Sequence, residues 1–156
     1  MLAHRILERW DFSRPPRELL DHIVPTLDTE LAPERDHLRP EVSASLRAIF
    51  TAFGTSDMYM RLRSAAILGR EVPFIMPWGD RQVMEGVIDL IYRLDGELWI
   101  ADYKTDQTTA EEAPTKAAFY SYQADIYRKA ATTCLGLPRV SFQLLFLRAG
   151  TSVELT

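Results

Sequence analysis

An Asp-Gly dipeptide at residues 95 and 96 separates two runs that are rich in β-branched and aromatic residues, QVMEGVIDLIYRL and ELWIADYKT. Asp-Gly between such runs predicts a β-hairpin closed by a two-residue type I′ turn. A turn of this length also determines how the two strands pair. Leu94 is then expected opposite Glu97. The same register places Asp89 directly opposite Asp102.

The hydrophobic period of the chain changes at Gly69. Before it, apolar residues recur at helical spacing and predict helices over 1–12, 16–24, 41–54 and 56–68, with a polar loop over 25–40. After it, REVPFIMPW predicts a strand over 70–78, followed by a Trp-Gly-Asp turn into the hairpin. A helix over 115–133, a strand over 140–148 and a polar tail complete the pattern. The order of helices, three strands, helix and strand indicates an α/β fold.

The composition limits the location of the protein and its possible metal ligands. A length of 156 residues fits one domain with one substantial core. No apolar run approaches the roughly 20 residues that span a bilayer, and the first residues are charged, so we expect a cytoplasmic protein with no membrane partner. The single cysteine, Cys134, excludes an internal disulfide and a cysteine-ligated metal centre. We therefore expect it to be a core thiol.

The charge balance argues against unaided binding of nucleic acid. The chain has 18 basic and 22 acidic residues, a formal net charge of −4. Nucleic-acid-binding domains usually carry a basic patch that neutralises phosphates. A DNA substrate would therefore need a bound divalent cation, a local basic rim or a fused partner.

The predicted hairpin brings charged side chains together. Asp102 and Lys104 lie two residues apart on one strand and share a face, which Asp89 on the neighbouring strand also shares. Two opposed carboxylates repel each other unless a cation lies between them. All-oxygen ligands favour Mg²⁺ or Mn²⁺. Alternatively, Asp102 only marks the end of a strand, and Asp89 is neutralised by Lys104 as an ion pair.

A series of short motifs follows between residue 4 and residue 127: AHRILERWDF, REVPF, GVIDL, ADYKTD and the Tyr-x-x-Gln-x-x-x-Tyr pattern within YSYQADIYRKA. Together, and in this order, they resemble the RecB/AddA-type nuclease domain of the PD-(D/E)xK nuclease superfamily, the C-terminal domain of helicase–nucleases. The resemblance implies a central mixed β-sheet flanked by helices, the restriction-endonuclease-like fold.

The resemblance also implies the residues of an active site. The implied metal ligands are His4, Asp89, Asp102 and the backbone carbonyl of Tyr103. The implied catalytic residues are Asp89, Asp102, Lys104, Glu71 and Gln123. The implied DNA-contacting or supporting residues are Tyr120, Gln123 and Tyr127. The expected cofactor is Mg²⁺ or Mn²⁺, without an iron–sulfur cluster, since members that hold a cluster use four cysteines.

The role of Lys104 follows from its neighbours. Two nearby carboxylates stabilise its charged form, so we expect an ammonium group rather than a general base. An ammonium at this place can position the attacking water and stabilise negative charge in the transition state.

The implied function is metal-dependent DNA hydrolysis, of the exonuclease type, in the processing of DNA ends during recombination and repair. The implied partners are single-stranded or duplex DNA ends and a helicase domain in the same chain or complex. Residues 1–156 are expected to be a single nuclease domain excised from the C-terminal end of a longer helicase–nuclease. Two alternatives remain. One is an inactive nuclease-like module for DNA guiding or subunit contact, and the other is an α/β enzyme acting on a small phosphorylated substrate.

Overall fold

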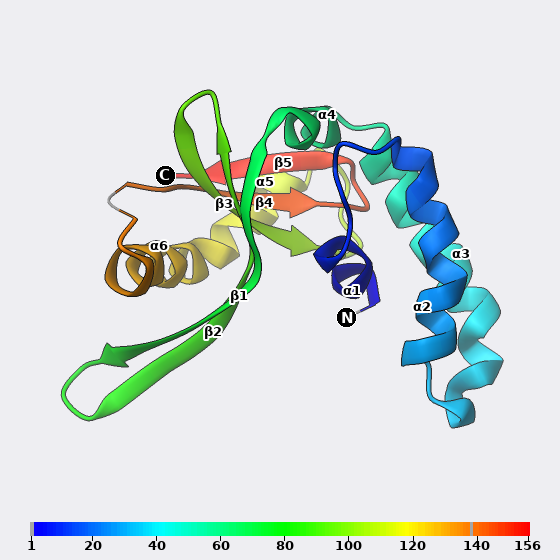
Figure 1. Ribbon diagram of the computed structural model, residues 1–156, viewed down its shortest axis with the longest axis horizontal. Coiled ribbons are helices and arrows are strands. Elements are labelled where there is room, and N and C mark those ends of the chain that lie inside the picture. The colour runs from blue at the N-terminus through cyan, green and yellow to red at the C-terminus, as the bar shows by residue number, and fades with distance from the viewer. Residues whose placement is uncertain (1, 138) are drawn as a thin grey trace.

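The computed structural model describes residues 2–137 and 139–156. Its centre is a five-stranded mixed sheet in the order β1-β2-β3-β4-β5, flanked by helices (Figure 1). The strands are β1 (Ala66–Trp78), β2 (Gln82–Leu94), β3 (Glu97–Lys104), β4 (Ser141–Phe146) and β5 (Thr151–Leu155). Strands β3 and β4 are parallel, and all other neighbours are antiparallel. The predicted α/β architecture with a central mixed sheet is confirmed.

The hairpin of β2 and β3 has the predicted register over its first part. Leu94 pairs with Glu97, and Asp95 and Gly96 have φ angles of 51° and 85°, as a type I′ turn requires. The ladder ends at the pair of Leu90 and Ala101.

Beyond that pair the strands separate, so the prediction that Asp89 and Asp102 are ladder partners is wrong. The amide of Tyr103 donates instead to Asp89 Oδ2 at 2.7 Å. In this part of the sheet β3 pairs along its other edge with the parallel strand β4, with Asp102 opposite Leu144. A side-chain acceptor from β2 thus replaces the backbone ladder at this place.

Helices from the first part of the chain cover one face of the sheet. They are α1 (Leu2–Glu8), η1 (Pro16–His22), α2 (Ile23–Glu30), η2 (Pro33–Leu38), α3 (Arg39–Gly54) and α4 (Asp57–Ser64). The predicted loop over 25–40 is wrong, because it contains most of α2 and all of η2. The helix predicted over 56–68 is too long, because β1 begins at Ala66. Ala66 and Ile67 pair with β2 across a bulge before Gly69, a contact that a helical pattern cannot reveal.

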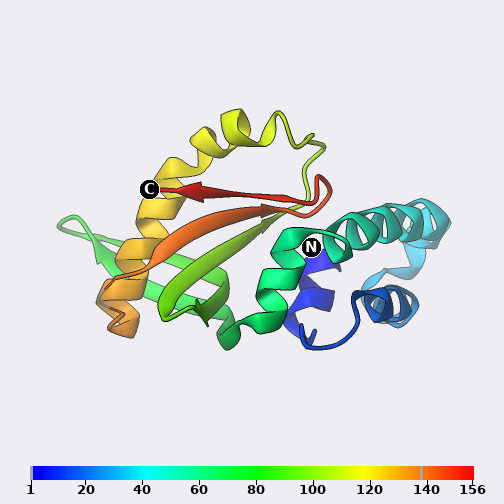
Figure 2. The same ribbon diagram turned by 90° about the horizontal axis from the view of Figure 1, so that it is seen from above.

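The other face of the sheet is covered by α6 (Ser121–Leu135), which follows α5 (Ala113–Ala117) and η3 (Ala118–Tyr120) (Figure 2). The single helix predicted over 115–133 is therefore interrupted. Tyr120 departs from helical geometry, with φ −100° and ψ 6°, and its hydroxyl donates to Asp106 Oδ2 at 2.8 Å. Gly136, at φ 65°, ends α6 in the left-handed conformation that glycine readily adopts.

The end of the chain is also ordered into the sheet. The predicted polar tail forms β5, which pairs with β4 from Phe146 and Thr151 onward, so this expectation is wrong. The prediction of a core thiol is wrong as well, because Cys134 is exposed near the end of α6.

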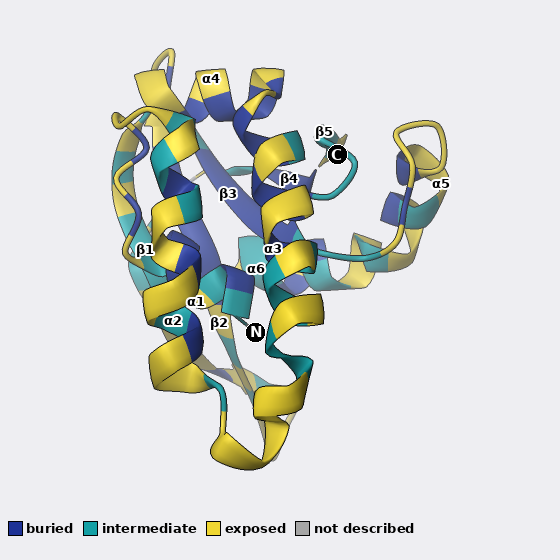
Figure 3. Ribbon diagram, turned by 90° about the vertical axis from the view of Figure 1, so that its right-hand side faces the viewer, coloured by how far each residue is buried: buried dark blue, intermediate teal, exposed yellow. Residues whose placement is uncertain are grey.

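Two apolar clusters hold the layers together. One joins β2 and β3 to α1–α4 and includes Leu7, Trp10, Phe50 and Phe53, whereas the other joins the sheet to α5 and α6. Figure 3 shows buried residues on the central strands and exposed ones along the outer sides of the helices. Among the helices of the described part, none is long and apolar enough to cross a membrane.

The first two strands extend beyond the sheet as a two-stranded ribbon (Figure 1). One side of this ribbon packs on α6 through Phe74, Met76 and Ile88. Its opposite side exposes Ile75 and Val83, each at 69%. The ribbon therefore places residues of β1 beside α6, far from them in the sequence.

Candidate functional site

The candidate site lies where β2 and β3 separate. Asp89 and Asp102, 9% and 4% exposed, come from these two strands, and α1 brings His4 to the same place. His4 Nε2 lies 3.2 Å from Asp89 Oδ2. The structure thus brings together three of the predicted metal ligands, although the two carboxylates are not cross-strand partners.

Lys104 and Gln123 form a network around Asp102. Lys104 Nζ lies 2.7 Å from Asp102 Oδ2, which makes the two side chains an ion pair. Lys104 Nζ donates to Gln123 Oε1 at 3.0 Å, and Gln123 Nε2 donates to Asp102 Oδ1 at 3.0 Å. The amide of Gln123 therefore holds the lysine and the carboxylate at once, and its position on α6 fixes both.

The two predicted tyrosines flank this network. Gln123 Nε2 lies 3.0 Å from the hydroxyl of Tyr127, whose ring packs edge-on against Phe74 at 5.8 Å. The ring centroid of Tyr120 lies 4.0 Å from Lys104 Nζ. The predicted stripe of Tyr120, Gln123 and Tyr127 therefore does face the site. Contact of these residues with DNA stays a prediction.

Glu71 lies in β1 with φ 46°, a conformation that residues other than glycine rarely adopt. The ladder pairs Arg70 with Leu90 and resumes at Val72, so Glu71 comes level with Asp89. Its Oε1 atom is buried without a hydrogen-bond partner. Backbone strain of this kind costs roughly 1 to 3 kcal/mol and often occurs where a side chain has a functional position.

A polar recess of about 250 Å³ opens at this end of the site. It is lined by His4, Arg5, Glu8 and Glu71. The predicted ligand His4 and the predicted catalytic Glu71 thus share one opening to solvent. This opening gives water and small ions a path to them.

Burial changes the acidity of Asp102. Removal from water raises the pKa of this carboxyl to about 6, and the charge of Asp89 acts in the same direction, whereas Lys104 and His4 act in the opposite one. A carboxylate with this environment binds a proton or a metal cation more readily than an exposed one.

Glu71 and His4 show related effects. Burial and the charge of Asp89 raise the pKa of the Glu71 carboxyl, although His4 acts to lower it. Burial lowers the pKa of the His4 imidazole, but the hydrogen bond and charge of Asp89 and the charge of Glu71 outweigh it, so the pKa is raised. The three carboxylates, Asp89, Asp102 and Glu71, therefore form one electrostatically coupled group.

The side chains fit a hard divalent cation in chemistry, although they are not arranged as a ready ligand set. Among residues 2–137 and 139–156, no three His, Cys, Asp or Glu side chains converge in a metal-binding arrangement. His4 contacts Asp89 directly, and Lys104 contacts Asp102. Even so, His4 Nδ1 and Glu71 Oε1 are buried without hydrogen-bond partners, and burying such polar atoms unpaired is costly. Carboxylate oxygens together with one imidazole suit Mg²⁺ or Mn²⁺.

Tyr103 has a buried side chain beside these groups. Its hydroxyl has no hydrogen-bond partner, and burial followed by the charge of Asp89 raises its pKa well above the usual value. Its amide binds Asp89. Ligation of a metal by its backbone carbonyl stays a prediction.

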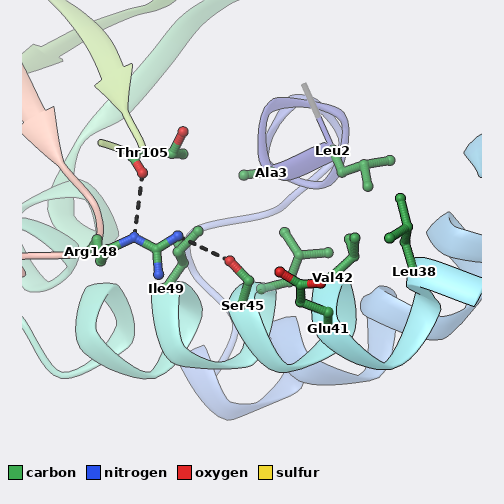
Figure 4. Close-up of a pocket in the computed structure, with 10 residues that line it drawn as sticks. Leu2, Ala3, Leu38, Glu41, Val42, Ser45, Ile49, Thr105 and Arg148 are labelled. Atoms are coloured by element: carbon green, nitrogen blue, oxygen red, sulfur yellow. Dashed lines mark hydrogen bonds between the residues drawn. The ribbon is translucent and has the colours of Figure 1, made fainter. Parts of the chain in front are cut away.

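A larger, mostly apolar pocket of about 490 Å³ lies between α1 and α3, next to this site (Figure 4). Arg148 lies at one end of it, where Nε donates to the carbonyl of Thr105 at 3.4 Å and a terminal nitrogen donates to Ser45 Oγ at 3.0 Å. Thr105 directly follows Lys104, so Arg148 ties the end of β3 to α3. The motifs give no sign of this role, because the contact joins segments far apart in the chain.

Comparison with known proteins places these residues in a family context. The model of the PD-(D/E)XK nuclease superfamily matches residues 1–152. The chain is 31% identical over 116 residues to an ATP-dependent helicase/nuclease subunit of Staphylococcus carnosus (strain TM300), covering 64% of this chain and 9% of the relative. It is 25% identical over 173 aligned positions to the protein of the same name from Staphylococcus haemolyticus (strain JCSC1435), covering 98% and 14%.

A third relative carries the same name in Staphylococcus aureus (strain JH9). It is 33% identical over 116 residues, which cover 64% of this chain. The chain spans only 9% to 14% of the length of these three relatives.

Proposed function

Because the chain belongs to the PD-(D/E)XK nuclease superfamily, we propose that it is a deoxyribonuclease that depends on Mg²⁺ or Mn²⁺. The observation that carries this proposal is the group formed by Asp89, Asp102, Lys104 and Gln123. It combines buried carboxylates for a cation with an ammonium group held in a fixed position. Such a combination suits phosphodiester hydrolysis, in which negative charge grows on the phosphate.

The metal would be held by His4, Asp89, Asp102 and the carbonyl of Tyr103. When bound, it would supply positive charge to the scissile phosphate and lower the pKa of a coordinated water. Asp102 takes part as the most deeply buried carboxylate of the group, with a pKa raised to about 6. Glu71, on its strained backbone, would orient water or a further ligand from the opposite side of Asp89.

Lys104 would act on the substrate itself. Its ammonium is paired with Asp102 and bonded to Gln123, so it has little freedom to move. A fixed positive charge stabilises a developing oxyanion without reorganising during the reaction. Gln123 is therefore a positioning residue, and Tyr120 and Tyr127 would support it or contact the DNA backbone.

The biological setting is suggested by the relatives, which are named as ATP-dependent helicase/nuclease subunits. The proposed role is exonuclease-type processing of single-stranded or duplex DNA ends in recombination and repair, in the cytoplasm. The proposed partner is a helicase domain in the same chain or complex, with residues 1–156 as one nuclease domain near the C-terminal end. Such a helicase could supply the positive charge for DNA that a chain of net charge −4 lacks.

The direct test is cleavage of end-labelled linear single-stranded and duplex DNA by the purified chain, with Mg²⁺, with Mn²⁺ and with EDTA. Cutting that requires a metal and stops in EDTA is the expected result. Failure to cut either DNA with either metal would contradict the proposal. That result would favour one of two alternatives: a nuclease-like module for DNA guiding or subunit contact, or a domain that cuts only when a helicase delivers the DNA.

A further inference from the structure

Two aromatic side chains beside the candidate site are exposed to solvent. Phe119, in η3, is 83% exposed, and Tyr122, in the first turn of α6, is 62% exposed. They lie three residues apart, on either side of the junction between η3 and α6 at Tyr120. Three residues make about one turn in a 3-10 helix and slightly less than one in an α-helix, so both side chains leave the same general side of this segment. Large aromatic rings bury roughly 150 to 250 Å² each when they find a partner, so this exposure leaves a large contact area unused.

These rings lie alongside the residues of the candidate site. Phe119 and Tyr122 each precede a site residue, Tyr120 and Gln123, by one position. One position is about 100° around a helix, since a turn has about 3.6 residues. The exposed stripe therefore flanks the stripe that contacts Lys104 and Asp102.

The β1–β2 ribbon contributes a third ring. Trp78 lies edge-on to Tyr122, with ring centroids 6.4 Å apart. Lys129, about two turns further along α6, places Nζ 4.3 Å from the centroid of the Trp78 ring. Phe119, Tyr122 and Trp78 are here called the aromatic row. Phe119 and Tyr122 are exposed, whereas Trp78 is partly buried against the apolar cluster that joins the sheet to α6, and Lys129 lies over its ring.

We infer that the aromatic row binds the bases of single-stranded DNA leading away from the site. Unstacked bases place their faces on aromatic rings with little dependence on sequence, and cations beside the rings contact the backbone. The bases of a duplex have both faces covered, so the row distinguishes a single strand from a duplex. This inference rests on the proposed nuclease function, because it takes the strand to be the one whose phosphate lies at Lys104.

The aromatic row has few cations around it, so we expect stacking of bases, rather than contacts with phosphates, to supply most of its affinity for DNA. The chain has a net charge of −4, and Lys129 is a cation that contacts the row. Arg128, at the preceding position, is already engaged by Asp125 and by the carbonyl of Leu155. The affinity for DNA should therefore depend only weakly on salt concentration. Each phosphate contact contributes about −0.7 to the slope of log K, where K is the association constant, against log salt concentration.

The test is fluorescence anisotropy of labelled oligonucleotides of about 12 residues with the whole chain in EDTA, so that no cleavage takes place. The probes are oligo(dT), an abasic sugar-phosphate strand of equal length, and a duplex. Oligo(dT) is expected to bind best. Phe119→Ala and Tyr122→Ala are each expected to weaken its binding about fivefold or more, because each removes one stacking surface.

Matched variants separate the role of the rings from general effects. Phe119→Tyr and Tyr122→Phe keep a ring and should bind as the unchanged chain does. Met60→Ala removes a side chain of similar exposure, 54%, from α4 and should have no effect. Lys129→Ala should reduce the salt slope by about 0.7. Circular dichroism spectra of all variants should coincide with that of the unchanged chain.

Three results would overturn the inference: equal affinity for abasic strand and oligo(dT), unchanged binding after both alanine substitutions, or no binding of oligo(dT). Cleavage with Mg²⁺ or Mn²⁺ is measured separately on the same preparations. If the unchanged chain cleaves DNA but its binding of oligo(dT) does not depend on the rings, the inference about the aromatic row is rejected and the proposed nuclease function is retained. If binding of oligo(dT) depends on the rings but no DNA is cleaved, the proposed nuclease function is rejected and the inference about the aromatic row is retained.

Discussion

Asp102 combines deep burial with two neighbours of opposite effect, Asp89 and Lys104. Burial and Asp89 prevail, so the pKa of Asp102 rises from 3.8 to about 6 in the folded chain. The folded state then holds this proton more tightly than the unfolded state does. Its contribution to stability is present below about pH 4 and is lost as the pH rises through about 6.

Asp102→Asn is expected to flatten the pH dependence of stability. In the unchanged chain, titration of Asp102 lowers the free energy of unfolding by about 2 to 3 kcal/mol between about pH 4 and pH 8. Because asparagine does not titrate, this decrease should be absent from the variant. Urea unfolding in EDTA at the two pH values measures this. Asp21→Asn, at an exposed position, is the control, and equal pH dependence of Asp102→Asn and the unchanged chain would refute the account.

Glu71 provides a test of backbone strain. Replacement by glycine and by alanine removes the same carboxylate, but only glycine adopts a φ of 46° without steric cost. Glu71→Gly should therefore be more stable than Glu71→Ala by about 1 kcal/mol. Thermal unfolding of the two variants gives the difference, and a more stable alanine variant would show that the strain is absent.

At the residue scale, the sequence predicts correctly which side chains lie close together, but it predicts their contact geometry less well. Asp89, Asp102, Lys104 and Gln123 do come together, as the hairpin and the motifs indicate. The prediction that Asp89 and Asp102 form a ladder pair is wrong because the β2–β3 ladder ends one pair earlier, and Asp89 Oδ2 accepts from the amide of Tyr103 instead. A turn signal determines the register of the strands near the turn, but not how far along the strands the ladder continues.

At the scale of elements, α6 and the β1–β2 ribbon position each other. A Cβ atom on Gly86 would lie 2.7 Å from Phe74 Cζ, and Phe74 packs on Tyr127 of α6. The absence of a side chain at residue 86 therefore permits this packing.

Gly86→Ala is expected to lower the free energy of unfolding by about 1 to 3 kcal/mol, because the ring of Phe74 must move from its packed position. Val83→Ala, on the exposed side of the same ribbon, should change it by about 0.5 kcal/mol or less. Chemical denaturation compares the two. Equal effects would show that the inner side of the ribbon is not tightly packed.

Gln123 connects α6 to the two proposed catalytic residues Lys104 and Asp102. Gln123→Met keeps the length of the side chain but removes both hydrogen bonds that align Lys104 and Asp102. We expect cleavage to slow about 10- to 100-fold, as for other residues that orient metal ligands. Affinity for Mn²⁺ should change less than the cleavage rate. Gln82→Met on the ribbon serves as the control, and an unaltered rate for Gln123→Met would remove the positioning role.

Some elements are predictable from the sequence and others are not. Helix α3 and the hairpin follow from clear periodicity and from the Asp-Gly turn. The segment over 25–40 resembles a loop in its proline and charge content, although Pro25 and Pro33 lie in the first turns of α2 and η2, where proline is tolerated. Strand β5 is short and polar, and it forms through pairing with β4 at the edge of the sheet.

At the scale of the whole molecule, the sheet joins two layers that each supply part of the candidate site. Helix α1 brings His4 from one face, and α6 brings Gln123 from the other, while β2 and β3 carry the carboxylates between them. Neither layer contains the complete set of residues. The proposed activity therefore depends on the intact fold and should be lost on unfolding together with both apolar clusters.

The most direct test of the central claim is Lys104→Ala, measured for both DNA cleavage and Mn²⁺ binding by calorimetry. We predict that cleavage falls about 100-fold or more while the Mn²⁺ dissociation constant changes little, because Lys104 acts on the phosphate and not on the metal. Lys116→Ala, on α5, should retain both properties. Cleavage by Lys104→Ala at the rate of the unchanged chain would contradict the account.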